Sequence, residues 1–286
     1  MNILDKKVIT HGVRNKSNIS NAIDYCLEEI KIKGFTVIES KLKKPEINKI
    51  RKKIDQIYKL QISEIGGKNN LKKLKEENIA RALSCYDDIF VKVATLEPIK
   101  KICEKLIGPV YTLISQNGII SRPKDFHSQH SWHRDMNYQH FTSSKPIAIS
   151  MLLCVDKFSE KTGGTYVLRG SHRHEEFPSE KFVKKNQEVI TANIGDLIIF
   201  DSMMFHRTGQ NNSNSIRRCI NQYYAPPIIK QTISFAKSLG NKKTFKKDVK
   251  MILGYGYENE PAYSAKLWRK NKIDKKKNYN SNLKSF

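Results

Sequence analysis

Apolar residues in the first hundred positions recur every three or four residues, which is the period of an amphipathic helix. One helix is predicted near residues 20–32, where Gly34 can end it, and another begins at Pro45. The apolar positions of these two helices are Ile23, Cys26, Leu27, Ile30, Ile47, Ile50, Ile54 and Ile57. The segment GFTVIES between them is predicted to be a strand, and a further helix is predicted near 95–107.

The pattern changes after residue 108. Short apolar or alternating runs then follow one another, separated by Gly and Pro, which is typical of a β-sandwich or jelly roll. The predicted strands are 110–121, 131–136, 147–155, 164–169, 188–193, 197–201 and 216–225. We therefore predict a mostly β protein with flanking helices.

These patterns divide the chain into four segments. Residues 1–107 are expected to be an N-terminal helical and strand segment that packs on the core and contains a loop at 62–78. Residues 108–227 form the β-rich core, and residues 228–270 form a C-terminal helical extension or lid. The tail at 271–286, rich in Lys and Asn, is predicted to be disordered.

The net charge of +24 raises the question of a nucleic-acid partner. Residues 107–226 carry a net charge of only +4, so the excess lies in the two flanks. The chain has 41 Lys and 11 Arg, whereas base recognition by bidentate contacts relies on Arg. With no nucleic-acid-binding motif present, we expect no nucleic acid partner. A solvated lysine surface and attraction of an anionic substrate both remain open.

The five cysteines show no metal-binding or redox spacing such as Cys-x-x-Cys. This usage is typical of a reducing, cytoplasmic setting. The N-terminal residues contain no apolar signal-peptide region, and no window approaches eighteen apolar residues. We therefore expect a cytoplasmic protein with no membrane span. The oligomeric state is left open.

The most informative polar cluster is His133-Arg134-Asp135 in SWHRDMNYQHF, followed by His206 in GDLIIFDSMMFHRTGQ. In a strand, residues i and i+2 point to the same face, so His133 and Asp135 can converge on one ion while Arg134 turns away. Two imidazoles and one carboxylate fit the facial triad that holds non-haem Fe(II). His206 would then come from a neighbouring strand or its end.

Other histidines offer alternatives. His127, His130 and His133 form an HxxHxxH pattern that suits zinc, but zinc sites usually recruit Cys or another close His. We expect His127 and His130 to be loop or substrate-facing groups, and His140 to lie near the site. The remaining pair, His172 and His174, is expected on the surface.

Arg217 follows His206 by eleven residues in the predicted strand IRRCINQYYA. An arginine binds a carboxylate through two parallel hydrogen bonds, so it suits a dicarboxylic acid near the metal. Neighbours in a strand face opposite ways, so either Arg217 or Arg218 can enter the barrel. The spacing favours Arg217.

These motifs, together with GGTYVLRGSHR at 163–173, resemble the phytanoyl-CoA dioxygenase (PhyH-like) family of Fe(II)/2-oxoglutarate oxygenases. The resemblance covers roughly residues 108–226 and implies a double-stranded β-helix (jelly-roll or cupin-like) core. It implies that Fe(II) and 2-oxoglutarate take part. It also implies catalytic iron ligands at His133, Asp135 and His206, and co-substrate contacts from Arg217, Thr208 and Gln116.

One departure concerns the strand IAISMLLCV, which has Met151 where the family often has an aromatic residue. Halogenating relatives replace the carboxylate ligand by a small residue, so Asp135 favours hydroxylation. The resemblance thus implies a dioxygenase that hydroxylates an unactivated C–H of a small-molecule metabolite. The alternatives are a nucleic-acid oxidative demethylase, a cupin-like metal enzyme independent of 2-oxoglutarate, and a binding module without activity.

Overall fold

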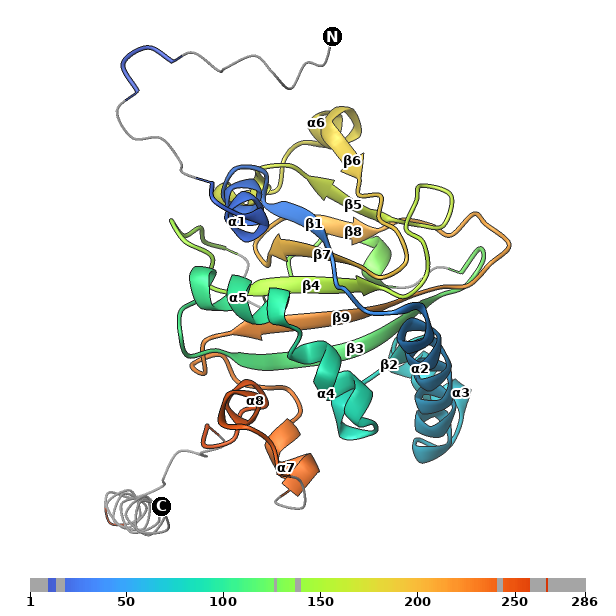
Figure 1. Cartoon of the computed structure of the whole chain (residues 1–286). Coiled ribbons are helices and arrows are strands. Elements are labelled where there is room, and N and C mark those ends of the chain that lie inside the picture. The colour runs from blue at the N-terminus through green and yellow to red at the C-terminus, as the bar shows by residue number, and fades with distance from the viewer. Residues whose placement is uncertain are drawn as a thin grey trace.

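The computed structural model describes residues 10–13, 19–125, 128–136, 140–240, 244–257 and 266 (Figure 1). Its helices are α1 (Ala22–Lys33), α2 (Lys44–Glu64), α3 (Lys68–Lys73), α4 (Asp88–Ala94), α5 (Glu97–Leu106), α6 (Glu180–Asn186), α7 (Phe235–Leu239) and α8 (Lys247–Ile252). Its strands are β1 (Phe35–Glu39), β2 (Ile79–Ala80), β3 (Thr112–Ser121), β4 (Ile149–Cys154), β5 (Thr165–Leu168), β6 (Gln187–Val189), β7 (Asp196–Asp201), β8 (His206–Thr208) and β9 (Arg217–Ala225).

The strands form two antiparallel sheets. The major sheet has the order β1-β7-β4-β9-β3-β2, and the minor sheet has the order β6-β5-β8. A single bridge between His133 and His206 adds one more backbone pair beside β8. The two sheets make the double-stranded β-helix that the sequence predicted.

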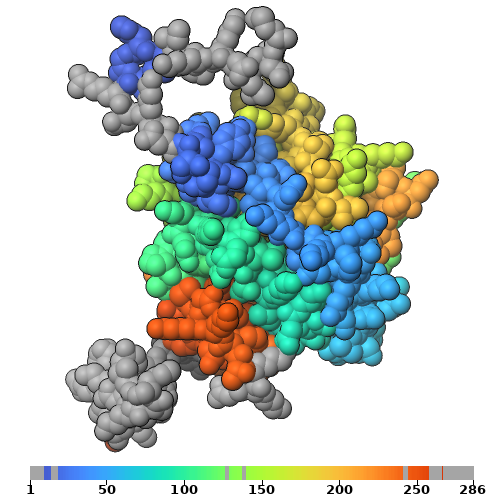
Figure 2. Space-filling view, viewed as in Figure 1, coloured from blue at the N-terminus to red at the C-terminus, as the bar shows by residue number. Residues whose placement is uncertain are grey.

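Two apolar clusters hold this arrangement together. One lies between the major sheet and the minor sheet and includes Leu152, Val167, Ile198 and Phe200. The other lies on the opposite face of the major sheet, where buried residues of α1, α2, α4 and α5 pack against β3, β4, β7 and β9. Figure 2 shows these N-terminal helices covering that side of the molecule, with the C-terminal elements beside them. The face of the major sheet that lines the inside of the barrel is therefore the one turned away from these helices.

Local signals explain where the first helices begin and end. The Asn21 side chain accepts hydrogen bonds from the backbone of Ile23 and Asp24, and Gly34 ends α1 in the left-handed region at φ 92°. Pro45 lies in the first turn of α2, where its missing N–H costs nothing. No helix in the described ranges is long and apolar enough to cross a membrane.

The structure corrects several of the predicted elements. Residues 131–136 do not form a strand, because His133 alone pairs and the chain then bends. The loop predicted at 62–78 contains the end of α2 and the whole of α3. The short helices α4 and α6 and the two-residue β2 had no clear sequence signal. The tail at 271–286 lies outside the described residues.

Candidate metal and co-substrate site

His133, Asp135 and His206 meet at one mouth of the barrel. They come from two chain segments, one with His133 and Asp135 and one with His206. Two backbone hydrogen bonds join these segments: the N–H of His133 donates to the His206 carbonyl, and the N–H of His206 donates to the His133 carbonyl, both at 3.0 Å. The Asp135 Oδ1 atom lies 3.8 Å from His133 Nε2 and 3.6 Å from His206 Nε2. Within the described ranges, this is the one group of His, Cys, Asp and Glu side chains close enough to share an ion.

The backbone fixes how the two imidazoles point. His133 Nδ1 lies 2.8 Å from the Ser131 carbonyl, and His206 Nδ1 lies 3.0 Å from the Met204 carbonyl. A carbonyl can only accept, so Nδ1 carries the proton in each ring and Nε2 keeps its lone pair. Both Nε2 atoms are thereby prepared to bind a metal ion.

Three observations fit a cation at this point. His133 Nε2 and Asp135 Oδ2 are buried and have no hydrogen-bond partner among the described residues. Burial alone would raise the pKa of Asp135, but the charges of His206 and His133 and hydrogen bonds from His206 and Ser150 lower it to about 2. The pKa of His133 is lowered by burial and by the charge of His206. Burial would lower the pKa of His206, but the charge of Asp135 and hydrogen bonds to Asp135 and Met204 raise it. An anionic carboxylate between two imidazoles is the donor set of a divalent ion, which would bind in place of a proton.

Arg134, between two members of this group, turns away from it. Its guanidinium stacks on the Phe205 ring, 3.9 Å from the ring centre, and donates to the carbonyls of Ser171, His174 and Glu175. This contact ties the bend at residues 133–135 to the loop after β5. The orientation predicted for Arg134 is therefore observed, although the segment is not a strand.

Arg217 is buried at the start of β9, with 2% of its surface exposed. Its guanidinium lies 4.4 Å from the centre of the Phe158 ring, and its Nε donates to the Thr162 carbonyl at 3.3 Å. No carboxylate pairs with it in the described part of the chain, and its Nη2 atom has no hydrogen-bond partner there. A buried cation without an anion is costly, so this side chain fits an anionic ligand.

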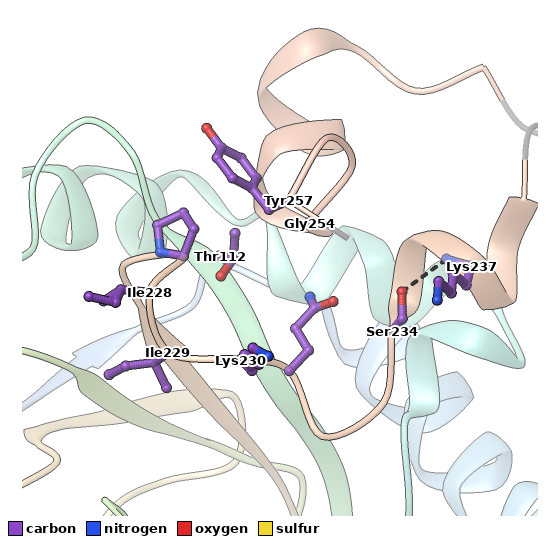
Figure 3. Close-up of a pocket in the computed structure, with 10 residues that line it drawn as sticks. Thr112, Ile228, Ile229, Lys230, Ser234, Lys237, Gly254 and Tyr257 are labelled. Carbon is purple, nitrogen blue, oxygen red and sulfur yellow. Dashed lines mark hydrogen bonds between the residues drawn. The ribbon is translucent and has the colours of Figure 1, made fainter. Parts of the chain in front are cut away.

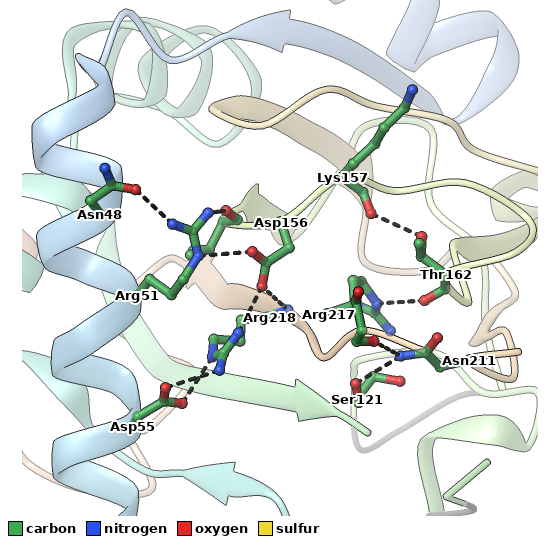
Figure 4. Close-up of polar contacts among 12 residues, drawn as sticks. Asn48, Arg51, Asp55, Ser121, Asp156, Lys157, Thr162, Asn211, Arg217 and Arg218 are labelled. Carbon is green, nitrogen blue, oxygen red and sulfur yellow. Dashed lines mark hydrogen bonds and ion pairs between the residues drawn. The ribbon is translucent and has the colours of Figure 1, made fainter. Parts of the chain in front are cut away.

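Arg218 faces the other way (Figure 4). Its Nε and Nη2 atoms donate to the Asp55 carboxylate of α2 at 2.8 and 2.9 Å, and its Nη1 donates to Asp156 at 3.1 Å. Arg51 joins the same network through Asp156 at 2.8 Å. Arg218 therefore fastens α2 to the outside of the sheet and has no access to the barrel.

The Gly163-Gly164 pair at the start of GGTYVLRGSHR packs closely against the backbone of Gly209. Gly163 has φ +77°, and a Cβ there would lie 2.4 Å from the Gly209 carbonyl oxygen. Gly209 N–H donates to the Gly164 carbonyl at 3.0 Å, one residue beyond β8. This contact sets the distance between β8, which carries His206 and Thr208, and the turn before β5. The Thr162 carbonyl of that turn accepts the hydrogen bond from Arg217.

The two remaining predicted co-substrate residues differ in outcome. Thr208 is two residues after His206 in β8 and so shares its face of the minor sheet. Gln116 is fully buried on the helix side, where it accepts from Ser84 and donates to the Phe90 carbonyl and to Gln222. All these contacts point away from the barrel, so the assignment of Gln116 to the co-substrate is corrected.

None of the other described histidines joins the group. His130 is buried in a short 3₁₀ turn, His140 is exposed, and His127 lies outside the described residues. The prediction of surface positions holds for His174 but is wrong for His172, which is 4% exposed and packs against Gly34. Met151, which replaces an expected aromatic residue, lies in the helix-facing cluster and not in the barrel.

A cavity of about 300 Å³ opens beside His133 and Asp135. Its floor is the barrel face of β3 and β9, which contributes Ser115, Asn117, Ile119, Asn221 and Tyr223. No motif marks these residues in the sequence, although Asn221 and Tyr223 follow Arg217 at two-residue intervals on the same face of β9 and the others pair with that face from β3. A second cavity of about 360 Å³, between the loop after β9 and α8, contains none of the predicted site residues (Figure 3). We therefore place the site in the first cavity.

Known proteins resemble this chain in sequence and in fold. The chain is 25% identical over 229 residues to an uncharacterized protein of Mycobacterium tuberculosis, a match that covers 78% of this chain and 82% of the relative. The fold of this chain resembles the crystal structure of HygX from Streptomyces hygroscopicus with nickel and 2-oxoglutarate bound. The TM-score is 0.56 at 13% identity, and the match covers 76% of this chain and 93% of that chain.

The crystal structure of EctD from S. alaskensis with bound Fe is also similar, with a TM-score of 0.55 and 15% identity, covering 70% of this chain and 75% of that chain. Both structural matches concern the fold. Residues 30–219 match the family model for phytanoyl-CoA dioxygenase (PhyH), which is more than half of the chain. The chain therefore belongs to the phytanoyl-CoA dioxygenase (PhyH) family.

Proposed function

We propose that this protein is an Fe(II)- and 2-oxoglutarate-dependent dioxygenase that hydroxylates an unactivated C–H of a small molecule. The observation that carries the proposal is the buried guanidinium of Arg217, which has no carboxylate partner among the described residues and lies in the same barrel as a His-Asp-His group with unsatisfied ligand atoms. A metal site alone would suit many enzymes. A metal site together with a buried receptor for a carboxylate suits a dicarboxylic co-substrate.

In this proposal each residue has a defined task. His133, Asp135 and His206 would hold Fe(II) on one face. With iron bound there, O2 is the oxidant, with one oxygen atom going to 2-oxoglutarate, which is converted to succinate and CO2, and the other going to the hydroxylated C–H. Arg217 binds the distal carboxylate of 2-oxoglutarate, and Thr208 adds a hydroxyl on the same side. Phe158 and Thr162 keep the Arg217 guanidinium in place through the stacking and hydrogen-bond contacts described above.

The related structures support the two cofactors, since one holds Fe and another holds 2-oxoglutarate. Asp135 supplies a carboxylate at the third ligand position, which favours hydroxylation over halogenation. Arg218, the other arginine of the pair, is bound by Asp55 and Asp156 on the helix side and is not available to the co-substrate.

The test is formation of succinate from 2-oxoglutarate by protein prepared without oxygen, loaded with Fe(II) and then exposed to air. We expect slow succinate formation even without a primary substrate, dependent on both Fe(II) and 2-oxoglutarate and absent when Zn(II) replaces iron. Activity that needs the metal but not 2-oxoglutarate would contradict the proposal and favour a cupin-like enzyme.

A further inference from the structure

The barrel face of β3 and β9 has two halves with different chemistry. Near Arg217 its side chains are largely apolar, with Ile119 beside Cys219, and Phe158 and Leu152 close by. Further along, the paired positions are Asn117 with Asn221 and Ser115 with Tyr223. The first half suits the carbon chain and distal carboxylate of 2-oxoglutarate. The second half forms the floor of the cavity beside His133 and Asp135.

Several polar groups of this second half have no partner in the protein. The Ser115 hydroxyl, the Asn221 amide and the Tyr223 hydroxyl make no hydrogen bond to any residue in the described part of the chain, although Tyr223 is 92% buried. Ser115 and Asn221 are half-buried, and all three residues line the cavity, so their polar groups are available to a ligand there. An alkyl chain in the cavity would strip water from all three groups and replace none of their hydrogen bonds.

The charges around the cavity are already balanced. Arg81, which lines it, is held by the Glu76 carboxylate through Nε at 2.6 Å and Nη2 at 2.5 Å. Its Nη1 atom reaches the Asn117 amide oxygen at 3.1 Å. Arg134 points its guanidinium at backbone carbonyls outside the cavity. Among the described residues that line the cavity, Arg81 and Arg134 are the cationic side chains and both have protein partners, so a substrate carboxylate or phosphate would have to compete with those partners.

From the polar floor, the balanced charge and the volume of about 300 Å³, we propose that the cavity receives a compact, uncharged, hydroxyl-rich group such as a sugar or cyclitol. Ser115, Asn221 and Tyr223 determine this specificity. Amide and hydroxyl side chains both donate and accept, which matches the hydroxyls of a polyol. The proposal rests on the proposed function, because the cavity is a substrate site only if the triad and Arg217 form the catalytic centre.

The test uses ligand-observed NMR on protein loaded with Zn(II) and 2-oxoglutarate, so that no turnover occurs. Two sets of probes of similar size are compared: D-glucose and myo-inositol against hexan-1-ol, cyclohexanol and hexanoate. We expect saturation transfer to the polyols and none, or much less, to the aliphatic probes. Stronger binding of hexanoate or of the alcohols, or no binding of either polyol, would overturn the proposal.

Variants locate the binding. Asn221→Leu keeps the branched shape of the side chain but replaces the amide by larger methyl groups, and should weaken polyol binding about fivefold or more, as expected for lost hydrogen bonds. Ser115→Ala should weaken it in the same direction. Asn214→Leu, on an exposed position outside the cavity, is the matched control and should bind like the wild type. Polyol binding that is unchanged in both cavity variants would overturn the proposal.

Saturation transfer to 2-oxoglutarate in the same samples separates the two claims. Bound 2-oxoglutarate without polyol binding contradicts only the specificity proposed here. Absence of 2-oxoglutarate binding contradicts the proposed function itself.

Discussion

Arg217 and Arg218 are adjacent in β9, yet their guanidinium groups lie on opposite faces of the major sheet. Arg217 enters the barrel and stacks on Phe158, whereas Arg218 binds Asp55 and Asp156 on the helix side. The two-residue period of a strand forces this division. Arg217 therefore has no carboxylate partner among the described residues, whereas Arg218 is paired with two carboxylates on the helix side of the sheet.

This division predicts different effects of the same substitution. Arg217→Ala should raise the KM for 2-oxoglutarate more than tenfold, because loss of a buried, charge-assisted contact costs about 2–5 kcal/mol. Arg218→Ala should leave that KM within about twofold and lower the melting temperature, since α2 loses its ion pairs with the sheet. Steady-state succinate formation and thermal unfolding measure the two effects.

Arg217→Lys is the second variant of this pair. A lysine keeps the charge but cannot form two parallel bonds, so we expect a KM between those of the wild type and Arg217→Ala. A larger KM effect in Arg218→Ala than in Arg217→Ala would show that the co-substrate lies elsewhere.

Gly163 provides a test of the backbone contact beside the site. Gly163→Ala should destabilise the fold by about 2–4 kcal/mol, because it adds left-handed strain and a clash with the Gly209 carbonyl. The matched control is Gly170→Ala, which has a similar φ of +76° but only one atom, at 4.0 Å, near the added Cβ. Equal losses of stability in urea unfolding would mean that the contact with Gly209 contributes nothing.

Asp201 predicts a dependence of stability on pH. Burial raises the pKa of this carboxyl to about 6, despite a hydrogen bond from the Met203 N–H and the charges of Arg173 and Arg134. The folded state thus holds the proton more tightly than the unfolded state, whose pKa is near 3.8. The free energy of unfolding should therefore fall as pH rises from 4 towards 7, by on the order of 2–3 kcal/mol from this group.

Asp201→Asn isolates that contribution, because the amide oxygen can still accept from Met203 but carries no charge. The variant should gain stability relative to the wild type as pH rises through 6, and the difference should level off above pH 7. Chemical unfolding between pH 4.5 and 8 measures it. A difference that is constant over this range, or that shrinks with rising pH, would refute the assigned role.

Much of the candidate site could be predicted from the sequence because its signals are local. The His-x-Asp pair, the distance to His206 and the position of Arg217 depend on spacing along short segments. The period of β9 correctly separated Arg217 from Arg218. The helices with regular apolar spacing, α1, α2 and α5, were also predicted, since each buries one continuous stripe of residues.

The errors arise where pairing between distant strands decides the outcome. Gln116 pairs with Gln222 and both face the helices, but nothing in either segment reveals that register. The shift in pairing between Leu113 and Ser115 has no sequence signal either. Asp135 reaches His206 through a bend, held by its N–H bond to the Ser202 carbonyl at 3.1 Å, and not through a strand.

The central claim is that His133, Asp135 and His206 together hold one iron ion. Its most direct test is the iron content of protein loaded with Fe(II) without oxygen and freed of excess metal, measured for the wild type and for His133→Ala, Asp135→Ala and His206→Ala. We predict one iron per wild-type chain and almost none in each variant, with circular dichroism unchanged. A variant that retains iron like the wild type would remove its residue from the site, and retention in all three would contradict the claim.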